Sequence, residues 1–231
     1  MTDEAIILAG GFGTRLKGVV KDTPKPMADI NGKPFLEYLL RFLKRNGISK
    51  VVLAVGYRWK IIYDYFGESY EGIEIKYSIE DEPLGTGGAI KKALNVIEKD
   101  WAYILNGDTF FNIPLSELTN KVNNETRLIV ALKKMYDFDR YGCVEIDIDG
   151  NVTGFKEKGF KSEGNINGGI YLASKRLFDS FNVGNKFSFE TFIEKNFLSI
   201  NMKAMVFDEY FIDIGIPEDY FRAQNEVNDY I

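Results

Sequence analysis

Short apolar runs alternate with segments of helical periodicity along the first half of the chain. The apolar runs are bounded by glycine and polar clusters, which is typical of buried strands. Between the first two runs, apolar residues recur at helical spacing over 35–43, with Pro34 near the start and Gly47 past the end. The pattern predicts strands at Ala5–Ala9, Val51–Val55, Ile73–Ile79 and Trp101–Leu105, and further helices over 59–66 and 88–97.

This alternation predicts an α/β fold with a Rossmann-like central sheet, mixed but mostly parallel, and flanked by helices. Ligands of such folds bind outside the carboxyl ends of the strands. Gly10 and Gly11 follow the first predicted strand, and Asn106, Gly107 and Asp108 follow the fourth. We therefore expect these two loops to lie together at a ligand-binding edge.

The second half of the chain is richer in strands and predicts a smaller β-rich lobe. The turn Asp149-Gly150-Asn151 separates two of these strands. Because no repeat, low-complexity segment or linker interrupts the sequence, we expect one domain over 1–231, with halves of about 1–110 and 111–231. The pattern predicts strands over 127–133, 143–148, 152–156, 166–173, 203–207 and 210–212, and helices over 177–181, 189–197 and 217–227.

The overall composition is that of a soluble globular protein: the 231 residues are 45% hydrophobic and 27% charged. A net charge of −5 argues against nucleic-acid binding, so local positive groups must hold any anionic ligand. No apolar run approaches the roughly 20 residues of a membrane span. The chain begins with a strand pattern rather than a signal peptide, so we expect a cytoplasmic protein without a membrane partner.

Two residue types are scarce, because the chain contains no histidine and a single cysteine, Cys143. Histidine bases, histidine-ligated metals, intrachain disulfides and thiolate zinc clusters are therefore excluded. A metal in this protein must be bound by oxygen atoms, and Mg²⁺ is the natural candidate.

The loop after the first strand is the most specific feature of the sequence, and it reads LAGGFGTRL over 8–16. Its three glycines leave backbone N–H groups accessible, which suits phosphate binding. Arg15 adds a fork of donors, and Lys25 lies between two prolines that stiffen its backbone. The loop has neither the Gly-Lys-Ser/Thr ending of a P-loop nor the Gly-x-Gly-x-x-Gly spacing of a dinucleotide loop. These residues together predict a site for a nucleoside triphosphate.

The pattern LAGGFGTRL…PKPM resembles the signature of the sugar-1-phosphate nucleotidyltransferases, and the resemblance extends along essentially the whole chain. It implies that a sugar 1-phosphate oxygen attacks the α-phosphorus of a nucleoside triphosphate and releases pyrophosphate. A phosphate monoester, with a second pKa of about 6, is largely dianionic near neutral pH, so this nucleophile needs no general base. By resemblance, Arg15 binds the triphosphate and Lys25 neutralises phosphate charge in the transition state. The nucleotide would also be bound by Leu8, Ala9, Gly10, Gly11, Gly13 and Thr14.

Two aspartates are candidate Mg²⁺ ligands. Asp108 follows an apolar strand and Gly107, whose small size leaves room for a ligand. Asp213 is flanked by isoleucines, where a carboxylate is costly to bury without a positive partner. Its segment resembles the late D-x-G-x-P motif of the family, and the resemblance assigns both aspartates to the metal. The simpler alternatives are a solvated turn residue for Asp108 and a helix N-cap for Asp213.

A later FKEK segment resembles the sugar-side F-x-E-K motif of the family. Alternation along a strand would place Lys156 and Lys158 on one face and Glu157 on the other. By resemblance, Lys158 binds the sugar phosphate and Glu157 a sugar hydroxyl, while Gly142 and Asn167 belong to a turn and a strand that contact the sugar. Without the resemblance, charges on such a strand are most simply solvated.

An acidic, glycine-containing stretch precedes the predicted helix at 88–97 and, by resemblance, approaches the base and ribose. Its candidate contacts are Glu80, Glu82 and Gly85. Guanine presents N–H donors that a carboxylate can accept, whereas an amide suits uracil and thymine better. Either glutamate therefore favours GTP. The alternative is that these acidic residues fill a loop or cap the helix.

Within the family, the stretch Val19–Met27 and the short chain most resemble the D-glycero-α-D-manno-heptose 1-phosphate guanylyltransferases, which would make a GDP-sugar for surface-polysaccharide synthesis. Mannose 1-phosphate guanylyltransferases and hexose 1-phosphate thymidylyl- or uridylyltransferases are alternatives with the same chemistry. A non-catalytic, nucleotide-sugar-sensing regulatory subunit is an alternative of another class, but retention of Arg15, Lys25, Asp108 and Asp213 favours an enzyme. The 18 phenylalanines and 13 tyrosines could also supply a homodimer surface.

Overall fold

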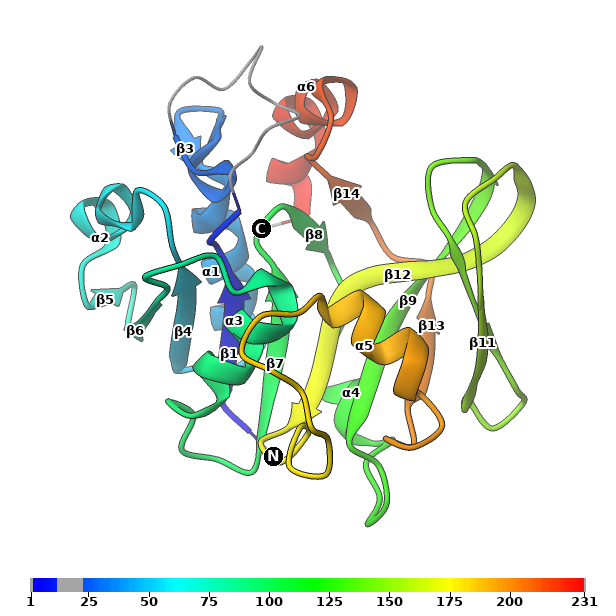
Figure 1. Ribbon diagram of the computed structural model, residues 1–231. Helices are drawn as coiled ribbons and strands as arrows, with labels where there is room; N and C mark the ends of the chain where they lie inside the picture. The colour runs from blue at the N-terminus through cyan, green and yellow to red at the C-terminus, as the bar shows by residue number, and fades with distance from the viewer. Residues whose placement is uncertain (1, 12–22, 231) are drawn as a thin grey trace.

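The computed structural model describes residues 2–11 and 23–230, in which a central sheet is covered by helices on both faces (Figure 1). The strands of the central sheet are β1 (Glu4–Leu8), β4 (Lys50–Val55), β5 (Ser69–Tyr70), β6 (Ile73–Ile79), β7 (Trp101–Asn106), β9 (Leu128–Phe138), β10 (Cys143–Ile146), β11 (Val152–Lys156), β12 (Lys161–Ser174) and β13 (Lys203–Phe207). The α-helices are α1 (Phe35–Arg45), α2 (Trp59–Phe66), α3 (Gly85–Leu94), α4 (Ser116–Thr119), α5 (Phe189–Asn196) and α6 (Pro217–Glu226).

Several small elements complete the fold. Two short antiparallel sheets pair β2 (Asp29–Ile30) with β3 (Lys33–Pro34) and β8 (Thr109–Phe111) with β14 (Phe211–Asp213). The 3₁₀-helices are η2 (Lys25–Met27) and η3 (Val227–Tyr230). No helix in the described part of the chain is long and apolar enough to cross a membrane.

The ten-stranded sheet has the order β11-β10-β12-β7-β1-β4-β6-β5, and β9 joins it by pairing with both β12 and β13. The consecutive strands β7, β1, β4 and β6 are parallel, whereas β12 runs antiparallel to β7. The register places Leu8 opposite Ala54 on one side and Asn106 on the other. These findings confirm the mixed α/β sheet and bring the carboxyl ends of β1, β4 and β7 to one edge.

Alternate residues of β1 face opposite layers, as the strand period requires. Ile7 packs into the core that contains α1 and Tyr220 of α6, and Ile6 packs into the core that contains α3 and α5. In Figure 1, α3 and α5 lie in front of the sheet and α1 lies behind it. Helix α1 ends where expected, because Gly47 adopts a φ of +79° that glycine tolerates without strain.

The strands of the second half extend the same sheet. Residues 170–174 of β12 pair with β7 on one side, and β9 pairs along most of the other side of β12. The register shifts between Asn167 and Ile170, where Gly169 has a φ of +73°. Strands β10 and β11 project from the body at the right of Figure 1. The predicted β-rich lobe is therefore formed by β9–β13 and continues the central sheet through β12.

Two predicted helices differ in the structure. The helix predicted over 88–97 is α3 and begins three residues earlier, at Gly85. Its first turn is held by tertiary contacts, since Gly87 N donates to Phe187 O at 3.0 Å, and the local sequence carries no such signal. The helix predicted over 177–181 is wrong: this segment forms single turns, with bonds such as Leu177 N to Ser174 O, three residues apart, at 3.0 Å.

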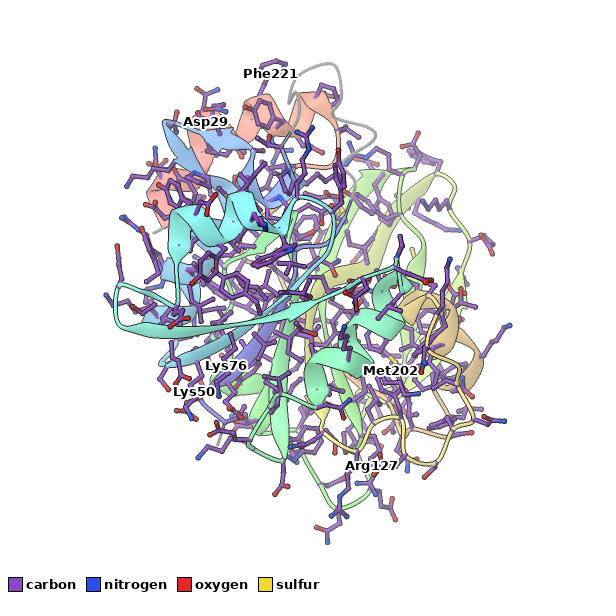
Figure 2. All side chains as sticks on the ribbon, turned by 60° about the vertical axis from the view of Figure 1, so that its left-hand side comes forward. Asp29, Lys50, Lys76, Arg127, Met202 and Phe221 are labelled. Atoms are coloured by element: carbon purple, nitrogen blue, oxygen red, sulfur yellow. The ribbon has the colours of Figure 1, made fainter. Side chains whose placement is uncertain are left out.

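The opposite end of the sheet carries a small charge network. Figure 2 shows Lys50 and Lys76 close together, far from Asp29 at the other end of the molecule. Their Nζ atoms lie 2.6 Å and 2.9 Å from the two carboxylate oxygens of Glu98. The network ties β4 and β6 to the loop after α3.

Candidate active site

A pocket of about 740 Å³ opens where β1, β4 and β7 end, as the topology predicts. Its walls come from the glycine loop after β1, the acidic stretch after β6, the first turn of α3 and the loop after β7. The predicted site residues that line it are Leu8, Gly10, Gly11, Lys25, Glu80, Glu82, Gly85 and Asp108.

The loop after β7 touches the last residue of β1 because Gly107 has no side chain. Its N–H donates to Leu8 O at 3.1 Å. A Cβ at this position would lie 2.3 Å from Leu8 O, so any larger residue would move the loop away from the end of β1. This contact holds Asp108 directly beside the glycine loop.

Lys25 and Asp108 form an ion pair in the pocket. Lys25 is the first residue of η2, between Pro24 and Pro26, and its side chain is 17% exposed. Its Nζ lies 2.8 Å from Oδ2 of Asp108, whose side chain is 31% exposed. The stiff proline segment therefore presents the ammonium to the carboxylate predicted to bind a metal.

The pairing of β8 and β14 brings Asp213 close to Lys25 and Asp108, although Asp213 does not itself line the pocket. Asp213 pairs with Thr109, and Ile214 N donates to Asp108 O at 2.9 Å. Oδ1 of Asp213 accepts from Gly215 N at 2.8 Å. Burial and the neighbouring Asp108 carboxylate raise the pKa of Asp213, although the Gly215 N–H and Lys25 act in the opposite direction.

A raised pKa means that the charged form of Asp213 lacks sufficient compensation from the protein. Two carboxylates, Asp108 and Asp213, meet without a third acidic, histidine or cysteine ligand among the described residues. This donor set suits Mg²⁺, which takes one or two carboxylates and completes its shell with phosphate oxygens and water. The residues therefore fit the predicted metal.

The two candidate base readers differ sharply. Oε2 of Glu80 accepts from Leu84 N at 2.8 Å, and its Oε1 would lie 3.1 Å from a Cβ on Gly10. Glu80 is thus half-buried and fixed between the glycine loop and the start of α3. Glu82 is exposed and forms no hydrogen bond or ion pair with the described residues. Glu80 is therefore held in one position beside the pocket, whereas Glu82 is exposed to solvent.

The pocket is also lined by residues that no sequence motif indicates. Glu190 of α5 lines it and accepts from Thr86 Oγ1 at 2.8 Å, and Phe189 N donates to the same hydroxyl at 2.8 Å. Tyr57, just after β4, lines the wall near Gly56. Nothing in the local pattern places Glu190 beside α3, because the contact joins segments about 100 residues apart.

The predicted sugar-side residues lie outside this pocket. Glu157 and Lys158 are exposed, and β11 ends at Lys156, so the expected strand alternation at 156–158 is wrong. The chain bends at Lys158 and Gly159 before β12 begins. Gly142 requires glycine, since a Cβ would meet Lys156 O at 2.6 Å.

Asn167 is held within its own strand, accepting from Gly169 N at 2.9 Å and donating to Tyr171 Oη at 2.5 Å. Among the predicted nucleotide ligands, Ala9 is buried, and its N–H donates to Ala54 O at 2.8 Å. Its side chain is therefore part of the core, and Ala9 does not line the pocket. Three of the predicted ligands lie outside the described residues, namely Gly13, Thr14 and Arg15.

Comparison with known proteins agrees with this geometry. The chain is 55% identical to a D-glycero-α-D-manno-heptose 1-phosphate guanylyltransferase of Campylobacter jejuni, over 95% of this chain and 97% of that protein. It is 51% identical to the enzyme of the same name from Aneurinibacillus thermoaerophilus, over 99% of this chain and 100% of that protein. A crystal structure of HddC from Yersinia pseudotuberculosis complexed with GMP-PN has a TM-score of 0.84 and 39% identity, covering 96% of this chain and 98% of that one.

The family match covers nearly the whole chain. Residues 4–230 match the family described as Nucleotidyl transferase. The matched region includes the glycine loop, the Lys25–Asp108 pair and Asp213. The resemblance read from the sequence motifs is confirmed, and the chain belongs to the nucleotidyl transferase family.

Proposed function

We propose that this protein transfers GMP from GTP to D-glycero-α-D-manno-heptose 1-phosphate and forms a GDP-heptose and pyrophosphate. The observation that carries this proposal is the identity above one half, along nearly the full chain, with two enzymes of that name. The pocket is consistent with it, because its walls combine a glycine loop, a half-buried ammonium and a fixed carboxylate. A cytoplasmic location, where GTP is supplied, and use of the product in surface polysaccharides belong to the same proposal.

The reaction needs alignment and charge neutralisation rather than a general base, because the attacking phosphate oxygen is already ionised. Backbone groups of Gly10 and Gly11 face the pocket and suit phosphate oxygens. Lys25 supplies positive charge at the reacting phosphate, and its ion pair with Asp108 keeps the ammonium in place. The protein thus provides fixed donors where negative charge develops.

Asp108 and Asp213 are the residues that would hold Mg²⁺. When bound, the ion would neutralise phosphate charge and lower the cost of bringing two anionic substrates together. Their carboxylates come from the loop after β7 and from β14, which the β8–β14 pairing brings together.

Glu80 is the residue that would recognise guanine. Leu84 N fixes one carboxylate oxygen, and the other oxygen points toward Gly10 in the pocket. A fixed carboxylate accepts the N–H donors of guanine without first losing side-chain entropy. Glu82, exposed and unanchored, is the weaker candidate.

The sugar phosphate would be bound by the β-rich lobe, through Lys158 for the phosphate and Glu157 for a hydroxyl, with Gly142 and Asn167 shaping the site. Lys158 and Glu157 are exposed and have no partner among the described residues, so both are available to a substrate. A homodimer remains part of the proposal, without an assigned surface.

Pyrophosphate release tests the proposal directly. GTP, ATP, UTP, dTTP and CTP are each combined with heptose, mannose, glucose and N-acetylglucosamine 1-phosphates in the presence of Mg²⁺. We expect turnover only with GTP and the manno-heptose phosphate. Turnover with GTP and mannose 1-phosphate would change the sugar assignment. Turnover with dTTP or UTP and glucose 1-phosphate would contradict the base assignment. Binding of a nucleotide sugar without any turnover would indicate a regulatory subunit instead.

A further inference from the structure

We propose that Arg140 is a positioning residue that fixes the Asp213 carboxylate through Tyr141 and thereby sets the divalent-cation affinity of the active site. The inference rests on the proposed function, because it takes Asp213 to be a metal ligand. Arg140 lies in the loop between β9 and β10, outside the pocket that would hold the nucleotide.

A continuous chain of hydrogen bonds joins these residues. Nη2 of Arg140 donates to Tyr141 Oη at 2.7 Å, and Tyr141 Oη donates to Asp213 Oδ2 at 3.4 Å. The Arg140 guanidinium carbon also lies 5.2 Å from the centre of the Tyr141 ring. Since the hydroxyl accepts from a cation, it becomes a stronger donor toward Asp213.

The far end of the chain is anchored in α6. The same Nη2 donates to Asp219 Oδ2 at 2.7 Å, and the Asp219 side chain is only 11% exposed. Asp219 lies in the first turn of α6, six residues after Asp213. Arg140 therefore connects the turn that carries Tyr141 to the segment that carries Asp213, and it holds both in register.

The two oxygens of Asp213 have separate partners. Oδ1 accepts from Gly215 N at 2.8 Å, and Oδ2 accepts from Tyr141. These two bonds fix the plane of the carboxylate and leave its remaining lone pairs for a cation. Partners that orient a metal ligand in this way typically change metal affinity by about 10–100-fold when removed. The long Tyr141 bond points to the lower end of that range.

Arg222 offers a matched control. Its Nη1 lies 3.0 Å from the other oxygen of Asp219, and it also contacts Glu226, but it does not contact Tyr141. Arg140→Gln and Arg222→Gln each remove one cation from the same buried aspartate. Because either variant leaves Asp219 one arginine, both are expected to fold. Only Arg140→Gln removes the link to Asp213.

The test measures Mn²⁺ binding to the full-length protein by electron paramagnetic resonance, with and without a non-hydrolysable GTP analogue. We expect Arg140→Gln to raise the Kd for Mn²⁺ about tenfold and Arg222→Gln to leave it within about twofold of the wild type. Tyr141→Phe should match Arg140→Gln, and the double variant should be no worse than either single one, because both act through one bond. The Mg²⁺ concentration for half-maximal turnover should follow the same order.

The direction in which Arg140→Gln changes the Mn²⁺ affinity distinguishes an orienting role of Arg140 from a purely electrostatic one. If Arg140 acted only as a nearby positive charge, its removal would tighten cation binding, and tighter binding would contradict the proposal. An unchanged Mn²⁺ Kd with a higher KM for the sugar phosphate would also contradict it, because Arg140 would then contact substrate. Asp213→Asn tests the metal assignment separately from the role of Arg140. If this variant keeps wild-type Mn²⁺ affinity, Asp213 is not a metal ligand and the metal assignment in the proposed function is wrong.

Discussion

At the scale of single residues, the site depends on charged side chains held by neighbours that are themselves fixed. Lys25 is stiffened by two prolines, Asp108 is placed by Gly107, and Asp213 is oriented by Gly215 N. Each group therefore loses little conformational entropy when a substrate binds. Preorganised charge of this kind, rather than proton transfer, is what a nucleotidyl transfer without histidine requires.

Glu80→Gln tests the base assignment at this scale. The amide oxygen can still accept from Leu84 N, so the loop should keep its structure while its NH₂ group faces the guanine donors. Loss of hydrogen bonds to a charged acceptor costs about 1.5–3 kcal/mol, so the KM for GTP should rise at least about tenfold. Steady-state kinetics with GTP measures the change. The control Glu82→Gln should leave the KM for GTP unchanged, and a larger effect there would transfer the role to Glu82.

At the scale of elements, the start of α3 is the part of the pocket that depends most on close packing. A Cβ on Gly88 would lie 2.1 Å from Asn185 O, and Phe187 O accepts from Gly87 N at 3.0 Å. The segment 183–190 thus packs directly against the first turn, where Gly85 and Thr86 line the pocket. A change that weakens this contact should therefore also alter the wall of the pocket.

Gly88→Ala should destabilise the protein by about 1–3 kcal/mol, the usual cost of overpacking, because the blocking atom belongs to the backbone. It should also raise the KM for GTP. Urea unfolding and steady-state kinetics measure the two effects. Gly184→Ala is the matched control, since a Cβ there meets nothing within 4 Å. Equal stability of the two variants would show that the segment moves freely away from α3.

The charge network at the opposite end of the sheet predicts a pH effect. Hydrogen bonds from Lys50 and Lys76 lower the pKa of Glu98 from 4.5 to about 2. A lowered folded-state pKa stabilises the fold above the unfolded value, and this contribution is lost as the pH falls toward 2.

The free energy of unfolding should therefore differ between the wild type and Glu98→Gln above pH 4.5 and converge as the pH falls toward 2. Because the Glu98 side chain is exposed, the difference should be small and should shrink in high salt. Chemical unfolding across this pH range measures it. Glu194→Gln, an exposed change without an ion pair among the described residues, should show no such dependence.

Local sequence patterns predict an element correctly where the spacing of its apolar residues matches the face that the element buries. Helix α2 and strands β6 and β11 have the predicted bounds. Two of the features that the local patterns miss share a physical cause, because both depend on distant residues. The β8–β14 pairing joins segments about 100 residues apart, and the first turn of α3 is held by Phe187.

The same limit applies to the site. The local sequence together with the family resemblance predicts Lys25, Asp108 and Glu80 as site residues, and all three line the pocket. The Lys25–Asp108 ion pair and the Arg140–Tyr141–Asp213 chain could not be predicted, because they depend on tertiary distances. Strand alternation failed at Glu157 and Lys158 because β11 ends before them.

At the scale of the whole molecule, the pocket joins both halves of the chain. Gly10, Lys25 and Glu80 come from the first half, and Glu190 comes from α5 in the second. A ligand that binds only the folded protein stabilises it, by about 2.7 kcal/mol at roughly 100 times its Kd. A nucleotide in this pocket should therefore stabilise the entire fold.

A non-hydrolysable GTP analogue with Mg²⁺ should raise the Tm by roughly 5–10 °C, because 1 kcal/mol corresponds to about 2–4 °C for a chain of this size. Differential scanning calorimetry measures the shift. The matching ATP analogue at the same concentration should give a clearly smaller shift, and equal shifts would argue against recognition of guanine by Glu80.

The central claim is that a sugar phosphate oxygen attacks the α-phosphorus of GTP in the pocket that Lys25 and Asp108 share. Labelled GTP tests it most directly, with heptose 1-phosphate and Mg²⁺ present. Label at the α-phosphate should appear in the GDP-sugar and label at the γ-phosphate in pyrophosphate, and Asp108→Asn should lower both rates at least about 100-fold without unfolding the protein. Transfer of the γ-label to the sugar, release of the α-label as GMP, or normal turnover of Asp108→Asn would contradict the account.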